Sequence, residues 1–297
     1  MKTVSLLIKR NCKLFFKDKG MFFTSLITPG ILLVLYATFL SNVYKNSFTA
    51  GLPSGVFLSD EIINGLVGGQ LISSLLAVSC VTVSFCSNFL MVQDKVNGSI
   101  RDLKMSPVRS SLLSIGYYIA TLLSSLIICL SAAALSIIYV AAIGWYMSAA
   151  DVLFFLLDTV LLVFFGTALS SVINFFLSTQ GQLSAVGTII SACYGFICGA
   201  YMPISSFGSG LQKIVSFLPG TYGTSLLRNH ALRGVLAEMN TQGLPNEAIA
   251  SLRDSVDCNI YFLGNTVSIP TMYLIISGAI LLLVGIYIIM NALKKKK

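Results

Sequence analysis

Charged residues are scarce in this chain. Only 10% of its 297 residues are Asp, Glu, Lys or Arg, and 56% are hydrophobic. A soluble domain carries about 25% charged residues. The mean hydropathy is +0.87. This composition excludes an ordinary soluble protein and predicts an all-α polytopic membrane protein whose surface mostly faces lipid.

The chain also has few of the groups that metal sites and catalytic sites use. His230 is the only histidine, and the seven cysteines are scattered without a Cys-x-x-Cys pair. Zinc sites and Ser-His-Asp catalysis therefore have almost nothing to use, and no disulfide framework is expected. A P-loop needs a Gly-Lys dipeptide, which the chain lacks. We predict no catalytic residue, no metal ligand and no cofactor site in this chain.

The basic residues are unevenly distributed. Of the 19 Lys and Arg residues, six precede Gly20, four lie between residues 94 and 109, and four close the chain. Basic residues gather in the loops on the cytoplasmic side of a membrane. We therefore place both termini and segment 94–109 in the cytoplasm. This placement argues that the net charge of +8 serves membrane topology and not nucleic-acid binding.

Long uncharged runs predict the membrane spans. No charge occurs over 62–93, 110–150 or 159–212, and the last run is too long for one span, so it must fold back near residues 178–182. We expect six transmembrane helices in a single domain 1–297, at about 21–43, 62–92, 110–143, 150–177, 183–202 and 270–291. An even number of spans agrees with two cytoplasmic ends.

The two segments outside these spans carry helical periodicity. Residues 1–19 predict an interfacial amphipathic helix on the inner membrane surface, with the basic residues Lys9, Arg10, Lys13 and Lys17 facing lipid headgroups. The extracellular segment 203–269 has apolar stripes at 211–218, 232–239 and 249–256. These predict short amphipathic helices, packed on the outer mouth or lying in the outer leaflet.

Two features inside the predicted spans admit two interpretations each. Asp158 is the only ionisable residue that we place well inside a span, so it either contacts substrate or protons, or makes a structural hydrogen bond to a neighbouring span. A stripe of small residues on the fifth span lets helix backbones approach closely, either at a dimer interface or within the chain. Its members are Gly187, Ser191, Gly195 and Gly199.

Segment 94–109 is a compact charged island between uncharged runs. Ser99-x-x-Asp102 has the form of a capping box, and Ser106 must leave the helical region before Pro107. We therefore expect a short helix over 100–105 that presents Arg101, Leu103 and Lys104 to the cytoplasm. From its residues alone the island is either a docking surface for a soluble partner or a simple connecting loop.

Several short motifs, taken in order, carry a family resemblance. They comprise residues 6–11 and 15–19, Pro29, Asp94-Lys95-Val96-Asn97-Gly98-Ser99 with Ser106-Pro107, residues 199–205, Leu218-Pro219-Gly220-Thr221-Tyr222, and Leu227-Arg228. With these motifs the sequence resembles the permease subunit of ABC-2 type exporters over nearly its whole length. Asp94 and Ser99 stand where the family more often has Glu and Thr.

The resemblance implies roles for these residues. The N-terminal helix would be the connecting helix, and the island would carry the coupling helix that docks into a separate ATP-binding subunit, which holds ATP and Mg. The coupling residues would be Asp94, Lys95, Gly98, Ser99, Ile100, Arg101, Asp102, Leu103 and Lys104. Two permeases, identical or homologous, would meet near spans 1 and 5. The outer gate would include Pro203, Leu218, Pro219 and Tyr222.

The expected function is therefore ATP-driven export across a bacterial cell membrane. The long outer segment favours a drug-like, peptide or lipid-like substrate over a polysaccharide. Two alternatives are a polysaccharide or glycolipid exporter of the same family, and an ATP-independent secondary carrier that uses Asp158. A third class, a membrane enzyme or assembly factor, has little support in a chain with one histidine.

Overall fold

The computed structural model describes residues 2–35, 38–39, 41–43, 45, 58–105, 108, 110–262 and 264–293. The expected loop between the first two spans, the Ser106-Pro107 stop and the tetralysine end lie outside these residues. Helices dominate the described residues, and the only strands among them form a two-stranded hairpin. The prediction of an all-α polytopic fold is confirmed.

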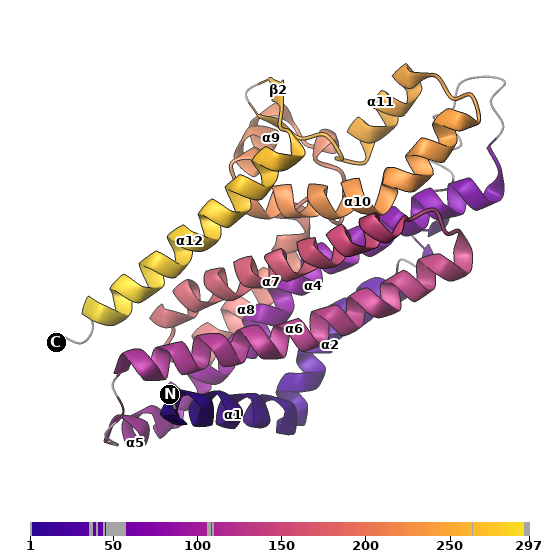
Figure 1. The fold of residues 1–297 in the computed structure, drawn as a ribbon. Coiled ribbons are helices and arrows are strands. Elements are labelled where there is room, and N and C mark those ends of the chain that lie inside the picture. Colours follow the sequence, from indigo (N-terminus) through magenta and orange to yellow (C-terminus); the bar gives the residue numbers. More distant parts are fainter. Residues whose placement is uncertain are drawn as a thin grey trace.

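Four long helices form the body of the molecule. They are α4 (Asp60–Val96), α6 (Ser110–Ile143), α7 (Ala149–Phe176) and α12 (Ile269–Leu293). Each is long and apolar enough to cross a membrane, and they correspond to predicted spans 2, 3, 4 and 6. α4 packs against α6 and α7, and α7 also packs against α12 (Figure 1).

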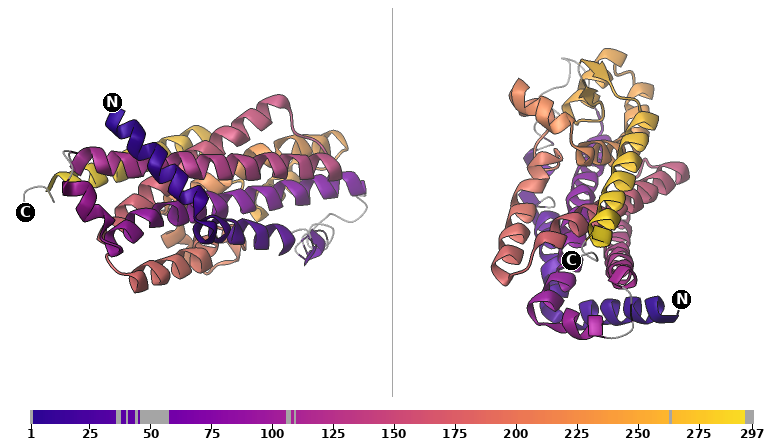
Figure 2. Two further views of the ribbon diagram at one scale, coloured as in Figure 1. Left: turned by 90° about the horizontal axis from the view of Figure 1, so that it is seen from below. Right: turned by 90° about the vertical axis from the view of Figure 1, so that its left-hand side faces the viewer.

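The N-terminal part is a bent pair of helices. α1 (Lys2–Lys17) meets α2 (Lys19–Leu35) at an angle of 72°. Neither helix alone is long and apolar enough to cross a membrane, but the two together are. α1 lies across one end of the bundle, as the right-hand view of Figure 2 shows. It packs on α6, where Gly116 has no side chain and lets Leu7 approach closely. The predicted N-terminal helix is thus present.

α4 is the buried centre of the bundle. Within the described residues, 94% of its most apolar window is buried. Four of its buried hydroxyls donate to carbonyls of their own helix, among them Ser79 to Leu75 at 2.6 Å and Ser84 to Cys80 at 2.7 Å. Small side chains with satisfied hydroxyls allow close helix packing in an apolar medium. Gly166 of α7 accordingly lies against the backbone of Cys80 and Val81.

The expected fifth span is shorter than predicted. α8 (Gln180–Ile197) begins with a capping box between Thr179 and Gln182. It ends before Gly199, whose φ of +73° is a left-handed conformation that glycine adopts at no cost. Polar residues along one face keep α8 below the apolarity of a free-standing span. The count of six spans therefore stays a prediction.

The segment after α8 differs most from expectation. α9 (Ser209–Ser216) and α11 (Asn246–Ser255) are short helices at the first and third predicted stripes. The second stripe belongs to α10 (Pro219–Thr241), a 23-residue helix that is largely buried against α4, α7 and α12. The expectation of a short surface helix there is wrong. Pro219, expected at the outer gate, is the first residue of α10, where its missing N–H costs nothing.

The remaining elements mark the two ends of the bundle. A 3₁₀ turn (Ile204–Ser206) precedes α9, and strands β1 (Tyr261–Phe262) and β2 (Asn265–Thr266) pair before α12. We call this the hairpin end. The opposite end, where α1, α5 (Ser99–Met105) and the close of α12 lie, is the α5 end (Figures 1 and 2).

Candidate functional site

The charged island contains the short helix that its sequence predicts. α5 begins at Ser99, directly after Gly98, whose φ of +81° ends α4 in a left-handed turn. Arg101 and Asp102 are exposed, and Met105 is 83% exposed. Leu103 instead packs partly against the apolar core. Leu103 thus has one side toward the core, and its expected contact with a cytoplasmic partner stays a prediction.

Asp94 is not part of an exposed surface. α4 continues through Val96, and the Asp94 side chain is only 8% exposed. Its carboxylate accepts hydrogen bonds from Arg10 of α1 at 2.9 Å and from the Tyr117 hydroxyl of α6 at 2.5 Å. Burial opposes the charge of Arg10, but the hydrogen bond and negative charge of Asp94 raise the pKa of the guanidinium above its ordinary value. Asp94 therefore joins three helices at the α5 end.

Lys95 connects the same turn to a fourth helix. Its Nζ donates to the carbonyls of Asn174 at 3.0 Å, Phe175 at 2.9 Å and Leu177 at 3.0 Å. These carbonyls close α7, where the helix dipole favours a positive charge. Asp94 and Lys95 thus hold the end of α4 against α1, α6 and α7.

The other basic residues of α1 have free outer surfaces. Lys9, Lys13 and Lys17 are exposed, whereas Arg10 turns inward to Asp94. Leu6, which is 67% exposed, and Phe16, which is 38% exposed, add apolar contact area to the same helix. This combination suits a helix at a lipid surface, although the interfacial role itself stays a prediction.

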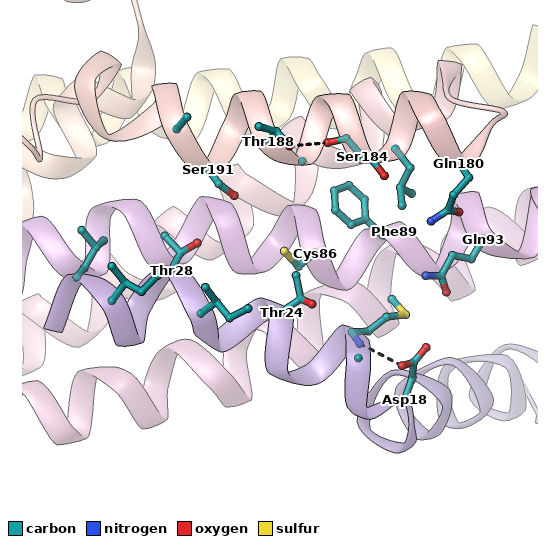
Figure 3. Close-up of a pocket in the computed structure, with 18 of the residues that line it drawn as sticks. Asp18, Thr24, Thr28, Cys86, Phe89, Gln93, Gln180, Ser184, Thr188 and Ser191 are labelled. Atoms are coloured by element: carbon teal, nitrogen blue, oxygen red, sulfur yellow. Dashed lines mark hydrogen bonds between the residues drawn. The ribbon is translucent and has the colours of Figure 1, made fainter. Parts of the chain in front are cut away.

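A groove of about 1020 Å³ opens between α2 and α8, with α4 as its floor. Its wall is mainly apolar and includes Ile27, Ile31 and Phe89. Figure 3 shows that hydroxyl and amide groups from all three helices face the same space. They belong to Thr24, Thr28, Gln93, Gln180, Ser184, Thr188 and Ser191.

The groove has little charge. Among the described residues that line it, Asp18 is the only charged one, and its Oδ1 accepts from the Met21 N–H at 3.1 Å at the start of α2. No basic side chain lines it in the described part of the chain. Such a wall suits an apolar or amphiphilic molecule held by a few hydroxyls. It offers no counter-charge to a polyanion.

The predicted stripe of small residues divides into two parts. Gly187 and Ser191 line the groove. Gly195 lies under the Tyr201 ring, and Gly199 lies against Ile204. Gly187 and Ser191 thus face the open groove, whereas Gly195 and Gly199 are covered by side chains of the chain itself. Contact within the chain is therefore observed for Gly195 and Gly199, and a dimer interface at Gly187 and Ser191 stays a prediction.

The hairpin end contains a buried charge network that the sequence did not reveal. Arg228 of α10 is 1% exposed and donates to Asp257 at 2.8 Å, to the Gly199 carbonyl at 2.6 Å and to Ser74 of α4 at 3.2 Å. The Gln70 side chain, oriented with its oxygen toward the guanidinium, accepts from Nε at 3.3 Å. One arginine thus holds together α4, α10, the end of α8 and the loop after α11.

The predicted gate residues lie next to this network. Pro203 precedes the 3₁₀ turn, whose Ile204 N–H donates to the Asp257 carboxylate at 2.9 Å. Leu218 and Pro219 form the start of α10, and the buried Tyr222 hydroxyl donates to the Ser216 carbonyl at 2.5 Å. The structure brings these segments together at the hairpin end. Their role as a gate stays a prediction.

Asp158 is bound by two helices that the sequence did not connect with it. Its carboxylate is 2.6 Å from His230 Nδ1 of α10 and accepts from the Tyr273 hydroxyl of α12 at 2.5 Å. The His230 ring stacks on Phe154 at 5.1 Å. In the sequence, the only hint of this contact was that the single histidine, His230, lies just before the apolar stripe 232–239. Neither Asp158 nor His230 lines the groove.

Comparison with known proteins adds one match. A family model described as ABC-2 type transporter matches residues 2–231, which include α1, the island, the groove and most of α10. No curated protein matches the chain.

Proposed function

Since the chain belongs to the ABC-2 type transporter family, we propose that this permease is the membrane subunit of an ATP-driven exporter. A separate ATP-binding subunit would dock at the α5 end and would hold the ATP and Mg. The exporter would work in a bacterial cell membrane, with both termini and α5 in the cytoplasm. The concentration of basic residues at the termini and in the island supports this orientation.

The connection of α5 to its neighbours is the observation that carries the proposal. The partner would contact the exposed Arg101, Asp102 and Met105. Its closure on ATP would displace α5, and the adjacent Asp94 and Lys95 would pass that displacement to other helices. Asp94 is tied to α1 and α6, and Lys95 to the end of α7.

The groove supports a substrate class. Its apolar wall, its row of hydroxyls and the shortage of positive charge favour a drug-like, peptide or lipid-like amphiphile. They disfavour an anionic polysaccharide or glycolipid, for which basic residues would supply complementary charge. Asp158 lies outside the groove and already makes two hydrogen bonds, to His230 and Tyr273, so a structural role suits it better than contact with substrate.

A second permease, identical or homologous, would close the open side of the groove. The two helices beside the groove carry large exposed apolar side chains, including Phe23 at 60% and Val34 at 60% exposure on α2, and Ile189 at 58% and Phe196 at 49% on α8. Burial of such side chains at an interface between two permeases would join their two grooves into one translocation path across the membrane.

Docking is tested by co-expression of the chain with an ABC-type ATP-binding subunit from the same genome, followed by co-purification. The double variant Arg101→Glu/Met105→Glu should abolish co-purification and ATP-dependent transport. Lys213→Glu is the matched control, because it reverses an exposed charge at the hairpin end. If the wild type never co-purifies, or the double variant keeps full transport, the docking role of α5 is wrong.

Substrate class is tested in inside-out membrane vesicles that contain both subunits. ATP should drive uptake of a fluorescent amphiphilic dye or a short-chain fluorescent phospholipid. Thr188→Trp, which fills the groove, should reduce uptake at least several-fold, and Leu281→Trp, at a 74% exposed position on α12, should not. Equal uptake by both variants would exclude the groove as the substrate path.

A further inference from the structure

Asp158, His230 and Tyr273 form a buried cluster at the meeting of three helices. The Asp158 side chain has no exposed surface, and that of His230 is 7% exposed. Asp158 Oδ2 faces His230 Nδ1 at 2.6 Å, and Oδ1 accepts from the Tyr273 hydroxyl at 2.5 Å. The residues come from α7, α10 and α12, so the cluster is the polar contact that these three helices share.

Other charges near the cluster are already matched. On α7, Asp151 lies 3.4 Å from Arg233 of α10, which is 63% exposed. On the other side of α10, Arg228 pairs with Asp257. α4 has no charged residue from 62 to 93, and α12 has none from 269 to 293, where Tyr273 and Tyr287 are the titratable groups. Asp158 and His230 must therefore balance each other.

This balance requires one proton on the pair. A buried carboxylate without a counter-charge costs several kcal/mol. Two arrangements avoid that cost, a charged carboxylate beside an imidazolium or a neutral carboxylic acid beside a neutral imidazole. Both hold one titratable proton between Asp158 and His230. Removing that proton leaves a net negative charge, and adding another leaves a net positive charge.

We propose that Asp158 and His230 form a proton-binding site that holds α10 against α7 and α12. This proposal rests on the proposed function in one respect, namely that α10 moves away from α7 during export. When the helices part, water reaches both side chains. A water-exposed carboxylate is charged above about pH 4, and a water-exposed histidine is neutral above about pH 6.5. Parting above pH 6.5 therefore releases one proton to water.

The release sets the sign and size of a pH effect. Above about pH 6.5 the closed arrangement holds one proton more than the open one, so rising pH favours opening. One proton corresponds to at most a tenfold change in the closed-to-open ratio per pH unit. Between about pH 4 and pH 6.5 both arrangements hold one proton, and the ratio is independent of pH.

The proton is directly observable because His230 is the only histidine. The full chain, purified with a histidine-free tag, is labelled with ¹⁵N-histidine and placed in lipid nanodiscs. At pH 6 its imidazole signals should show either two protonated nitrogens or a bare Nδ1 facing a protonated carboxyl group. A protonated Nδ1 with a bare Nε2, the pattern of a neutral imidazole beside a charged carboxylate, would overturn the proposal.

Hydrogen exchange of the α10 amides, corrected for intrinsic rates, tests the coupling. Wild-type protection should fall by up to tenfold per pH unit above about pH 6.5. Asp158→Asn should show no such fall. His230→Gln should extend the fall to about pH 4.5, because the proton then resides on Asp158 alone. Tyr273→Phe, the control, keeps the wild-type slope.

The outcomes are decisive without the ATP-binding subunit. If wild type and Asp158→Asn share one pH profile, the site is not a proton switch. If Asp158→Asn does not fold, the extended range of His230→Gln still decides. A failure of co-purification would overturn the proposed function and leave these measurements unaffected.

Discussion

We expect Arg228→Met to destabilise the fold far more than the same substitution five residues later, at Arg233. Arg228 is 1% exposed and its side chain is in contact with Asp257, Gly199, Ser74 and Gln70. Methionine fills much of the same volume but donates no hydrogen bond. It would leave the Asp257 carboxylate buried without a cation.

The magnitude follows from these contacts. Removing one partner of a buried ion pair costs about 3–5 kcal/mol, because the remaining charge stays uncompensated. Arg233 is 63% exposed, so water screens its pair with the buried Asp151, and the pair contributes at most about 1 kcal/mol. In the double variant Arg228→Met/Asp257→Asn no charge is left alone. The double variant should therefore cost about 1–3 kcal/mol, mainly for the unpaired acceptors.

The assay is the free energy of unfolding of the full chain in mixed micelles, titrated with dodecyl sulfate and followed by circular dichroism. Arg228→Met, Asp257→Asn, their combination and Arg233→Met complete the set. Two results would refute the reasoning. One is an equal loss for Arg228→Met and Arg233→Met, and the other is a double variant as unstable as the sum of its single changes.

Three further predictions concern other contacts. Lys95→Met removes the donor to three carbonyls at the end of α7. It should lower the free energy of unfolding by about 1–3 kcal/mol in the same titration, and reduce ATP-dependent transport more than ATP hydrolysis. Gly234→Ala would press a Cβ onto the Tyr146 carbonyl and should cost about 1–3 kcal/mol, whereas Gly285→Ala, which meets nothing within 4 Å, should change the melting temperature little. Asp94→Asn keeps the shape of the side chain but weakens the tie to α1, so exchange of the α1 amides should rise while α12 is unaffected.

The long helices could be predicted because uncharged runs in a membrane chain leave few alternatives. α4, α6, α7 and α12 follow directly from them. The short helix α5 was also within reach, because Gly98 and Pro107 fix its limits from local backbone rules. Its exposed face was not, since seven residues are too few for periodicity to separate Leu103 from Met105.

The buried position of α10 could not be read from its residues. Arg228, His230 and Arg233 make the segment resemble a surface helix. Arg228 and His230 are buried only because their partners come from elsewhere, with Asp257 29 residues and Asp158 72 residues away in sequence. Local patterns do not encode such pairings. For the same reason Asp94 and Lys95 resembled parts of a solvated loop, although Arg10 lies 84 residues from Asp94 and the Asn174 carbonyl lies 79 residues from Lys95.

The polar interior of α4 has a consequence for how the chain is made. α4 is the least apolar of the four long helices, with a mean hydropathy of 2.0 against 2.4 to 2.6 for the others. Its packing partners α6, α7 and α10 all follow it in the chain, so the ribosome completes α4 before any of them exists. A nascent chain that ends at residue 143 would hold α4 in lipid without α7 and α10, and we expect it to remain bound to the insertion machinery or to be degraded. Release of the chain from the insertion machinery would then depend on α10, which is synthesised more than a hundred residues after α4. Membrane quality control would therefore recognise a chain without α10 as incomplete.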